Sequence, residues 1–196
     1  MLTLGSGKVY AAAYNSAAAD GAWALASINT YYPTTAGTSG LFLIGEVGGD
    51  VEFNIEFQEK EFNGQANFPI AKGFYGGKVS LGAKKVELDF GNLKRLLGAT
   101  QSSGTDNNGE TYGETGQFTA GATPTPPALY VRFEHTRSDD PSKKVKIHLW
   151  KAYSMKLTYP FTREDIATHD IDFSAIADRR QSDGLYTYKV FTVEVE

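Results

Sequence analysis

Hydrophobic and polar residues alternate strictly along residues 51–58, and this alternation is the clearest structural signal in the chain. The apolar residues of the run are Val51, Phe53, Ile55 and Phe57, and the polar residues are Glu52, Asn54, Glu56 and Gln58. A period of two is that of a β-strand, whose successive side chains point to opposite faces. The pattern therefore predicts a strand with one buried face and one face in water.

A second alternating run covers residues 78–84, and the segment between the two runs, residues 59–77, predicts a loop. The polar positions of the second run include Lys78, Ser80 and Lys84. The alternation breaks after Ala83, because Lys85 falls where an apolar residue is due. A β-bulge or a sharp bend near residues 83–85 is expected, since one extra residue resets the register of a strand.

Similar patterns predict the remaining elements. Further strands are expected at residues 2–4, 41–47, 129–135, 144–149, 171–176 and 186–195. The strand at 144–149 is expected to continue past Ala152, with its apolar residues at changed parity. One short helix is expected at residues 89–97, with Asp89 as its N-cap and Gly98 just after its last turn. Residues 1–40 predict an arm or loop, and residues 99–127 predict a long polar loop in which a hairpin around residues 110–118 stays possible.

Composition supports a mainly β protein. The chain has 196 residues, which fits one domain over 1–196, and it contains 21 glycines and 13% aromatic residues. There is no cysteine, and no run reaches the ~20 apolar residues of a membrane-spanning helix. The net charge of −4 argues against a dedicated nucleic-acid binder. Residues 128–160 carry +4 and residues 161–196 carry −4, and these blocks can pair within one copy or between copies.

Candidate catalytic chemistry is sparse. His135, His148 and His169 all lie in strand-like runs, without the spacing of a metal site. His169 and Asp170 could join Ser174 in a catalytic arrangement only if the fold brought them together. We therefore predict no enzymatic activity, no catalytic residue, no metal and no cofactor.

Two sets of residues each allow two interpretations. The polar positions of residues 52–58 and 78–84 fit a solvated sheet face with cross-strand charge pairs, or the hydrophilic lining of a channel. Large apolar side chains also occur in the predicted loop, at Phe62, Phe68, Phe74 and Tyr75. They fit a loop folded onto its own core, or a contact with a neighbouring subunit.

The order of these elements resembles a known family. The relevant motifs are Glu59-Lys-Glu-Phe-Asn-Gly64 followed by Phe68-Pro69, then Gly76-Gly-Lys-Val79, the helix at Asp89, Asp172-Phe-Ser-Ala-Ile-Ala177, and the closing strand from Tyr186 to Val195. Over residues 41–98 and 166–195 the chain resembles the bacteriophage major tail tube protein family, which is related to type VI secretion tube proteins.

The resemblance implies a β-sandwich or split barrel with one short flanking α-helix. It implies that six copies form a ring, that inner strands of the ring join into a β-barrel around a lumen, and that rings stack into a tube for DNA passage. The lumen-facing residues would be Glu52, Asn54, Glu56, Gln58, Lys78, Ser80 and Lys84. The ring-stacking residues would be Glu59, Glu61, Phe62, Phe68, Phe74 and Tyr75.

The implied partners are further copies of the chain and other virion tail proteins. DNA would be present only in transit through the lumen, and no membrane insertion is expected. The implied location is the phage tail of the virion, after assembly in the host cytoplasm.

Other functions stay open at this stage. A second β-rich virion protein, such as a head decoration or tail-terminator protein, would also oligomerise but would stop at a ring or trimer. A carbohydrate-binding β-sandwich could use aromatic faces from Trp23, Tyr31, Tyr32 and Trp150. An enzyme is the least favoured class, because the sequence shows no recognisable arrangement of catalytic residues.

Overall fold

The fold is mainly β, as the alternating patterns predict. A computed structural model of the chain describes residues 2–14, 41–63, 69–87, 96, 100–102, 117–119, 126–158, 168–182 and 185–195. Its strands are β1 (Leu2–Leu4), β2 (Gly7–Ala13), β3 (Phe42–Val47), β4 (Val51–Asn63), β5 (Pro69–Glu87), β6 (Thr100–Ser102), β7 (Gln117–Thr119), β8 (Leu129–Thr136), β9 (Lys144–Thr158), β10 (Thr168–Ala175), β11 (Asp178–Ser182), β12 (Leu185–Lys189) and β13 (Phe191–Val195).

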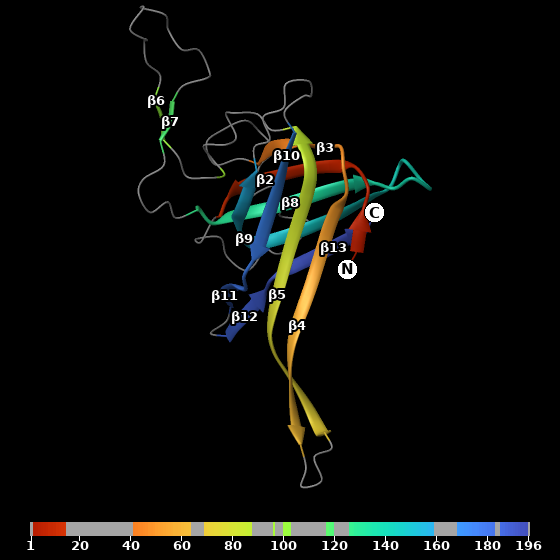
Figure 1. The fold of residues 1–196 in the computed structure, drawn as a ribbon, viewed down its shortest axis with the longest axis vertical. Helices are drawn as coiled ribbons and strands as arrows, with labels where there is room; N and C mark the ends of the chain where they lie inside the picture. The colour runs from red at the N-terminus through yellow and green to blue at the C-terminus, as the bar shows by residue number, and fades with distance from the viewer. Residues whose placement is uncertain are drawn as a thin grey trace, which may run out of the picture.

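One antiparallel sheet contains most of these strands and rolls around the core (Figure 1). Its order is β1-β4-β5-β10-β9-β8-β2-β3, with β13 added to β9. The roll returns on itself where β3 meets β5, at the single register pair Val47 and Val86. Since this pairing does not continue along the strands, the described architecture is a split barrel and not a closed one. Two small hairpins, β6–β7 and β11–β12, form separate sheets.

The core fills the inside of the roll. Its buried side chains come from β2, β3, β4, β5, β8, β9 and β10, and include Val9, Ile44, Val51, Phe53, Leu81, Val86, Val131, Phe133, Ile147, Leu149, Ile171 and Phe173. At one end Phe53 meets Phe191 of β13 edge-to-face, with ring centroids 5.3 Å apart. Of the predicted helix at 89–97 only Leu96 is described; it is helical and fully buried in the same core.

Bulges occur where the sequence loses its alternation. On β5, Ala83 pairs with Ile171 and Val86 with His169, so three steps on β5 face two on β10. Ala83 and Val86 are both buried although they are an odd number of residues apart. The bulge predicted near residues 83–85 is therefore confirmed. The strand does continue past Ala152, and its ladders shift register near Trp150 and again at Met155. The predicted apolar face of Tyr153 and Met155 is wrong, because Ala152 and Ser154 are the buried residues and Met155 is 66% exposed.

The loop predicted over residues 59–77 is wrong, since β4 and β5 continue as a paired ladder as far as Asn63 and Pro69. The outer part of this hairpin extends well beyond the rolled sheet (Figure 1). A ribbon without a core beneath it has no buried face, so its sequence has no reason to show the apolar period of two. Residues 64–68, which include Phe68, lie outside the described part of the chain.

The N-terminal region contains more structure than predicted. The expected strand at residues 2–4 is confirmed as β1, but β2 was missed although it lies between β3 and β8 in the sheet. Val9, Ala11 and Ala12 of β2 are all fully buried, so both of its faces are covered in part. A strand buried on both faces loses the alternating pattern, and alanine has low β-propensity. Residues 15–40 lie outside the described residues.

The C-terminal region also differs in detail. The predicted closing strand is divided by Val190 into β12 and β13, which belong to different sheets. In the polar segment 99–127 the described pairs join β6 to β7, from Thr100 with Thr119 to Ser102 with Gln117, and the rest of the possible hairpin at 110–118 lies outside the described residues.

A row of alternating charges crosses the outer face of one wall of the roll. In register it runs Glu46, Lys8, Glu134, Lys146 and Glu194, on β3, β2, β8, β9 and β13. Lys8 Nζ lies 2.8 Å from Glu46 Oε1, and Lys146 Nζ lies 3.7 Å from Glu194 Oε2. Opposite charges on directly facing residues favour this register over a slip by one residue.

A partly buried polar cluster holds strand β13 against this wall. His148 of β9, which is 1% exposed, lies 2.7 Å from the Tyr130 hydroxyl through Nδ1 and 3.3 Å from Glu194 Oε2 through Nε2. The Trp150 indole N–H donates to Thr192 Oγ1 at 3.0 Å. Burial lowers the pKa of His148 from 6.5 to about 4, although Glu194 opposes the shift and Arg132 and Lys146 reinforce it.

Close packing at Gly7 gives a first prediction. A Cβ at this position would lie 2.5 Å from Cε2 of Phe133 and closer still to the backbone oxygen of Glu134. Because a backbone oxygen cannot move aside cheaply, Gly7→Ala should lower the free energy of unfolding by roughly 1–3 kcal/mol in urea titrations. The control is Gly5→Ala, where the nearest atom is 3.6 Å away and no loss is expected. Equal stability of the two variants would contradict the packing described at Gly7.

The pKa of His148 gives a second prediction. Between pH 6.5 and about 4 the unfolded chain binds a proton at this ring that the folded protein does not. Stability therefore falls as the pH drops through this window, by up to about 3 kcal/mol, and the loss ends once the folded protein is also protonated. Urea titrations at pH 7 and 4.5 should show a smaller difference for His148→Gln than for the unchanged chain. If His148→Gln showed the same pH dependence of stability as the unchanged chain, protonation of His148 would not be the cause of the loss.

Candidate functional site

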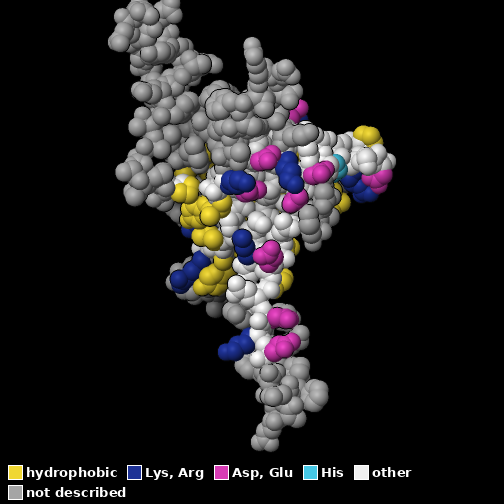
Figure 2. Space-filling model, viewed as in Figure 1, with side chains coloured by type: hydrophobic (Ala, Val, Ile, Leu, Met, Phe, Trp, Pro, Cys, Tyr) yellow, Lys and Arg dark blue, Asp and Glu magenta, His cyan; other side chains and the backbone are white. Residues whose placement is uncertain are grey.

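An extended polar surface lies on the outer face of β4, β5, β10 and the second half of β9. Antiparallel register places polar residues side by side across it. One row joins Glu52, Gly82, Asp172 and Lys156, and the next joins Asn54, Ser80, Ser174 and Tyr153. Glu56 pairs with Lys78 where the hairpin leaves the body. Figure 2 shows acidic and basic side chains interspersed on the body and along the hairpin, with no single sign dominating.

A groove of about 400 Å³ runs along this polar face. Its wall is built from Glu52, Asn54, Glu56, Lys78, Ser80, Gly82, Met155, Asp172, Phe173 and Ser174. The Asp172 carboxylate lies over Gly82, where a Cβ would come within 2.9 Å of Asp172 Oδ1. The surface therefore offers hydroxyl, amide and charged groups in one continuous band.

Lys84 closes one end of the band. Its Nζ lies 2.8 Å from Glu52 Oε1. This hydrogen bond and the charge of Glu52 raise the pKa of Lys84 above its ordinary value, so the ammonium group stays charged. The pair is exposed, and water and salt weaken surface ion pairs of this kind, so its main effect is to neutralise charge locally.

The sequence predicted seven residues of this face, and the structure brings all of them onto two adjacent strands. Glu52, Asn54, Glu56 and Gln58 lie on β4, while Lys78, Ser80 and Lys84 lie on β5. The contribution of β10 and β9 was missed. Asp170, Asp172 and Ser174 alternate with Ile171 and Phe173, so the signal existed, but only the pairing of β10 with β5 shows that it extends the same face.

Both edges of this four-stranded band end in backbone without a strand partner among the described residues. On one side β1 pairs only with residues 51–53 of β4, and the outer edge of β4 continues to Asn63. On the other side β8 pairs with β9 only as far as Ala152, and β9 continues to Thr158. Unpaired N–H and C=O groups at such edges are ready to pair with another chain.

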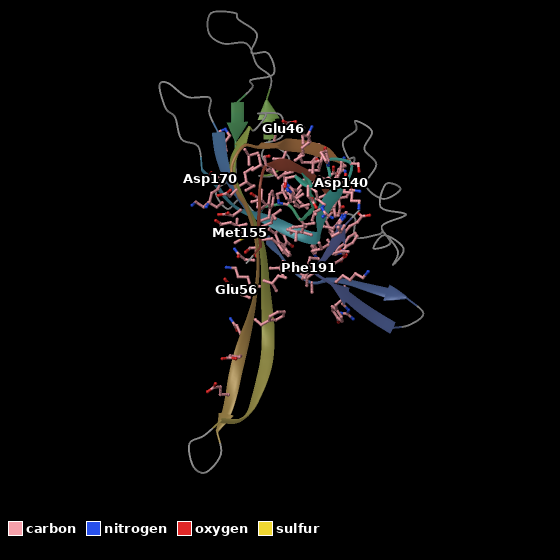
Figure 3. The ribbon with its side chains drawn as sticks, turned by 90° about the vertical axis from the view of Figure 1, so that its right-hand side faces the viewer. Glu46, Glu56, Asp140, Met155, Asp170 and Phe191 are labelled. Carbon is pink, nitrogen blue, oxygen red and sulfur yellow. The ribbon has the colours of Figure 1, made fainter. Side chains whose placement is uncertain are left out.

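The opposite face of β4 departs from the predicted pattern. Val51 and Phe53 are buried, as expected, but Ile55 is 37% exposed and Phe57 is 68% exposed. The reason is that the hairpin leaves the body after Phe53, so the apolar face continues without a core to cover it. In Figure 3 Glu56 lies on one side of the hairpin, while Phe191 and the β11–β12 hairpin lie on the other side. By alternation, Phe57 points to the side away from Glu56.

The residues expected in ring stacking lie on the outer part of the hairpin. Glu59 and Glu61 are exposed on β4. The backbone of Phe74 pairs with Glu59, that of Tyr75 with Gln58, and that of Phe62 with Ala71. Phe68 and the side chains of Phe62, Phe74 and Tyr75 lie outside the described part of the structure.

Alternative chemistry finds little support in the described residues. His169 is buried on the inner face of β10, whereas Asp170 and Ser174 lie on the outer face, so the three are not brought together. No group of three or more His, Asp or Glu side chains is placed to hold a metal ion in the part of the chain that is described. Trp150 is fully buried, so it cannot stack on a sugar, and Trp23, Tyr31 and Tyr32 lie outside the described ranges. Among described residues no helix has the length and apolarity to cross a membrane.

Comparisons with known proteins add little. No protein-family model and no curated protein matches this chain. Among solved structures the chain is similar to one titled "Crystal structure of Hcp protein", with 10% sequence identity over 96% of this chain and 98% of that chain and a TM-score of 0.29. At this TM-score the similarity supports no argument about function, which must come from the surface itself.

The change of environment along β4 gives a third prediction. Phe53→Ala should lower the free energy of unfolding by about 3–5 kcal/mol, because it empties a site in the core. Phe57→Ala, on the same strand and face, should leave it within about 0.5 kcal/mol of the unchanged chain at concentrations where the chain is monomeric. Urea titration of both variants is the measurement. A large loss for Phe57→Ala in the monomer would mean that its side chain is covered within one copy.

Proposed function

We propose that this protein is a structural subunit that assembles through the edges of its polar sheet into a tube. The observation that carries the proposal is a polar face across β4, β5, β10 and β9 that ends at each side in strand edges without a described partner. An open edge exposes a monomer to aggregation, whereas a closed ring of copies removes every such edge.

In the proposed assembly the outer edge of β4, beyond its pairing with β1, joins the part of β9 beyond Ala152 from the next copy. The polar band then becomes continuous around a lumen. Within it lie Glu52, Asn54, Glu56, Gln58, Lys78, Ser80 and Lys84, together with Asp172 and Ser174 of β10. Mixed charges and neutral polar groups suit a conduit, because a strongly basic lining would retain passing nucleic acid.

The finer proposal is a bacteriophage tail tube, consistent with the sequence resemblance. Six copies per ring, stacked rings and DNA in transit are parts of this proposal, as is a location in the virion beside other tail proteins. The outer part of the β4–β5 hairpin, on which Phe62, Phe74 and Tyr75 lie, projects from the body and is, together with Phe68, our candidate for contacts between rings. Repetition of such a head-to-tail contact along one axis gives an open filament.

A disulfide experiment tests the edge pairing. The chain has no cysteine, so a double variant Asn54→Cys, Met155→Cys carries only the two new thiols. Within one copy these residues lie on β4 and β9, separated by β5 and β10, hence about 14 Å apart and beyond the reach of a disulfide. After mild oxidation we expect a ladder of covalent oligomers on non-reducing gels, ending at the size of the ring.

Single-cysteine variants serve as controls and should give dimers at most. Negative-stain electron microscopy of the unchanged chain over a concentration series gives the second readout. Rings or hollow tubes together with the ladder support the proposal. Monomers at every concentration would overturn it, and rings or trimers that never stack would favour a decoration or terminator role.

A further inference from the structure

Two ribbons project from the lower end of the body, and each consists of only two strands. The outer part of the β4–β5 hairpin extends beyond the rolled sheet, and β11–β12 forms a two-stranded sheet of its own. Figures 1 and 3 show both at the lower end of the body, diverging from each other. An isolated two-stranded ribbon is marginally stable in water, so each ribbon gains from a surface to pack against.

The hairpin carries a distinct stripe on its face away from the polar band. Along β4 this stripe contains Ile55, Phe57, Glu59 and Glu61, which share one parity because the register shift near Phe57 adds its extra residue to β5 and not to β4. Phe57 is 68% exposed, and both glutamates are exposed. The stripe is therefore apolar near the body and acidic farther out.

The β11–β12 ribbon has the complementary chemistry. Arg179 is exposed, and its cross-strand partner Tyr188 is 58% exposed. Lys189 and the buried Asp178, the next pair toward the base, lie on the other face of the ribbon and are not part of this surface. An aromatic ring beside a guanidinium group fits a surface that presents Phe57 beside Glu59, since arginine pairs with carboxylates and both rings exclude water.

We propose that the stripe Ile55–Glu61 of one copy packs against the β11–β12 ribbon of the neighbouring copy in the same ring. The proposal rests on the tube function, which places the Glu56 side of the hairpin toward the lumen. The β11–β12 ribbon then lies on the outer side (Figure 3) and is displaced sideways from the hairpin base (Figure 1). Rotation about an axis parallel to the hairpin keeps both ribbons at the same height, so the sideways ribbon reaches behind the hairpin of the next copy.

The contact supplies a lateral interface separate from the pairing of strand edges. Glu59 and Glu61 then act within the ring, as does the level of the hairpin at which Phe74 pairs with Glu59, and Phe62 and Phe68 stay the candidates for contacts between rings. Copies are joined twice, once by backbone hydrogen bonds on the lumen side and once by side chains on the outer side.

A cross-link between single-cysteine variants tests the contact directly. Glu59→Cys and Arg179→Cys chains are purified separately, mixed, allowed to assemble and then oxidised. We expect a covalent dimer of the two different chains, and it should also form in isolated rings, since stacking is not required. The matched control replaces Arg179→Cys by Lys143→Cys, in the turn near Asp140, away from both ribbons (Figure 3), and should give no such product.

Charge reversal supplies a second readout. Arg179→Glu should raise the concentration needed for assembly by roughly two- to five-fold, because surface ion pairs contribute little each. Glu59→Arg mixed with Arg179→Glu should recover part of the loss, and Lys143→Glu should change nothing. The loss of the Phe57 ring in Phe57→Ser should act more strongly, by roughly ten-fold or more.

The outcomes separate this contact from the tube function. Rings seen by electron microscopy without the Glu59–Arg179 cross-link, and unaffected by Arg179→Glu, would overturn the lateral contact and leave the tube function standing. Failure of the unchanged chain to form rings would overturn both. A cross-link that appears only in stacked tubes and not in isolated rings would also overturn the proposal, because it would place the contact between rings.

Discussion

The fold depends on strand β9, which belongs to both walls of the roll. Its first half pairs with β8 and β13, while its second half pairs with β10. Two register shifts within the strand allow this change, and they place Ile147, Leu149 and Ala152 in the core despite the odd spacing of Ala152. A bulge increases twist and bends the strand. Without it the polar wall and the charged wall could not enclose the same apolar core.

The two walls have different outer surfaces. On the β13 side, side chains of the same copy contact one another across the outer face: these are the alternating charge row, the His148 cluster and the buried Trp150. On the β4–β5 side polar residues are arranged in register but the strand edges end without a described partner. Side chains of one copy pair across the outer face of the first wall, whereas the second wall presents a polar face bounded by parts of β4 and β9 that have no strand partner among the described residues. This difference between the walls is the basis of the proposed assembly.

Sequence reasoning succeeded wherever one face of a strand meets the core and the other meets water. It located β3, β8 and the first halves of β4 and β9, and it anticipated the bulge of β5 from the misplaced Lys85. It failed for β2, whose alanines are covered on both faces, and for the outer hairpin, which has no core beneath it. The failures have related causes: the period of two is clear only where one face is buried and apolar, whereas β2 has Ala12 buried on its outer face and the outer hairpin has no core against either face. The exposure of Phe57 was invisible for a related reason, since alternation does not reveal where the body ends.

The edge-to-face contact between Phe53 and Phe191 has a mechanical consequence. It joins the root of the long hairpin to the start of the C-terminal strand, although the two residues are far apart in the chain. The position of the hairpin root and the position of β13 are therefore coupled through one pair of rings. A shift of the hairpin that moves Phe53 must also displace Phe191, and with it the strand that carries Thr192 and Glu194.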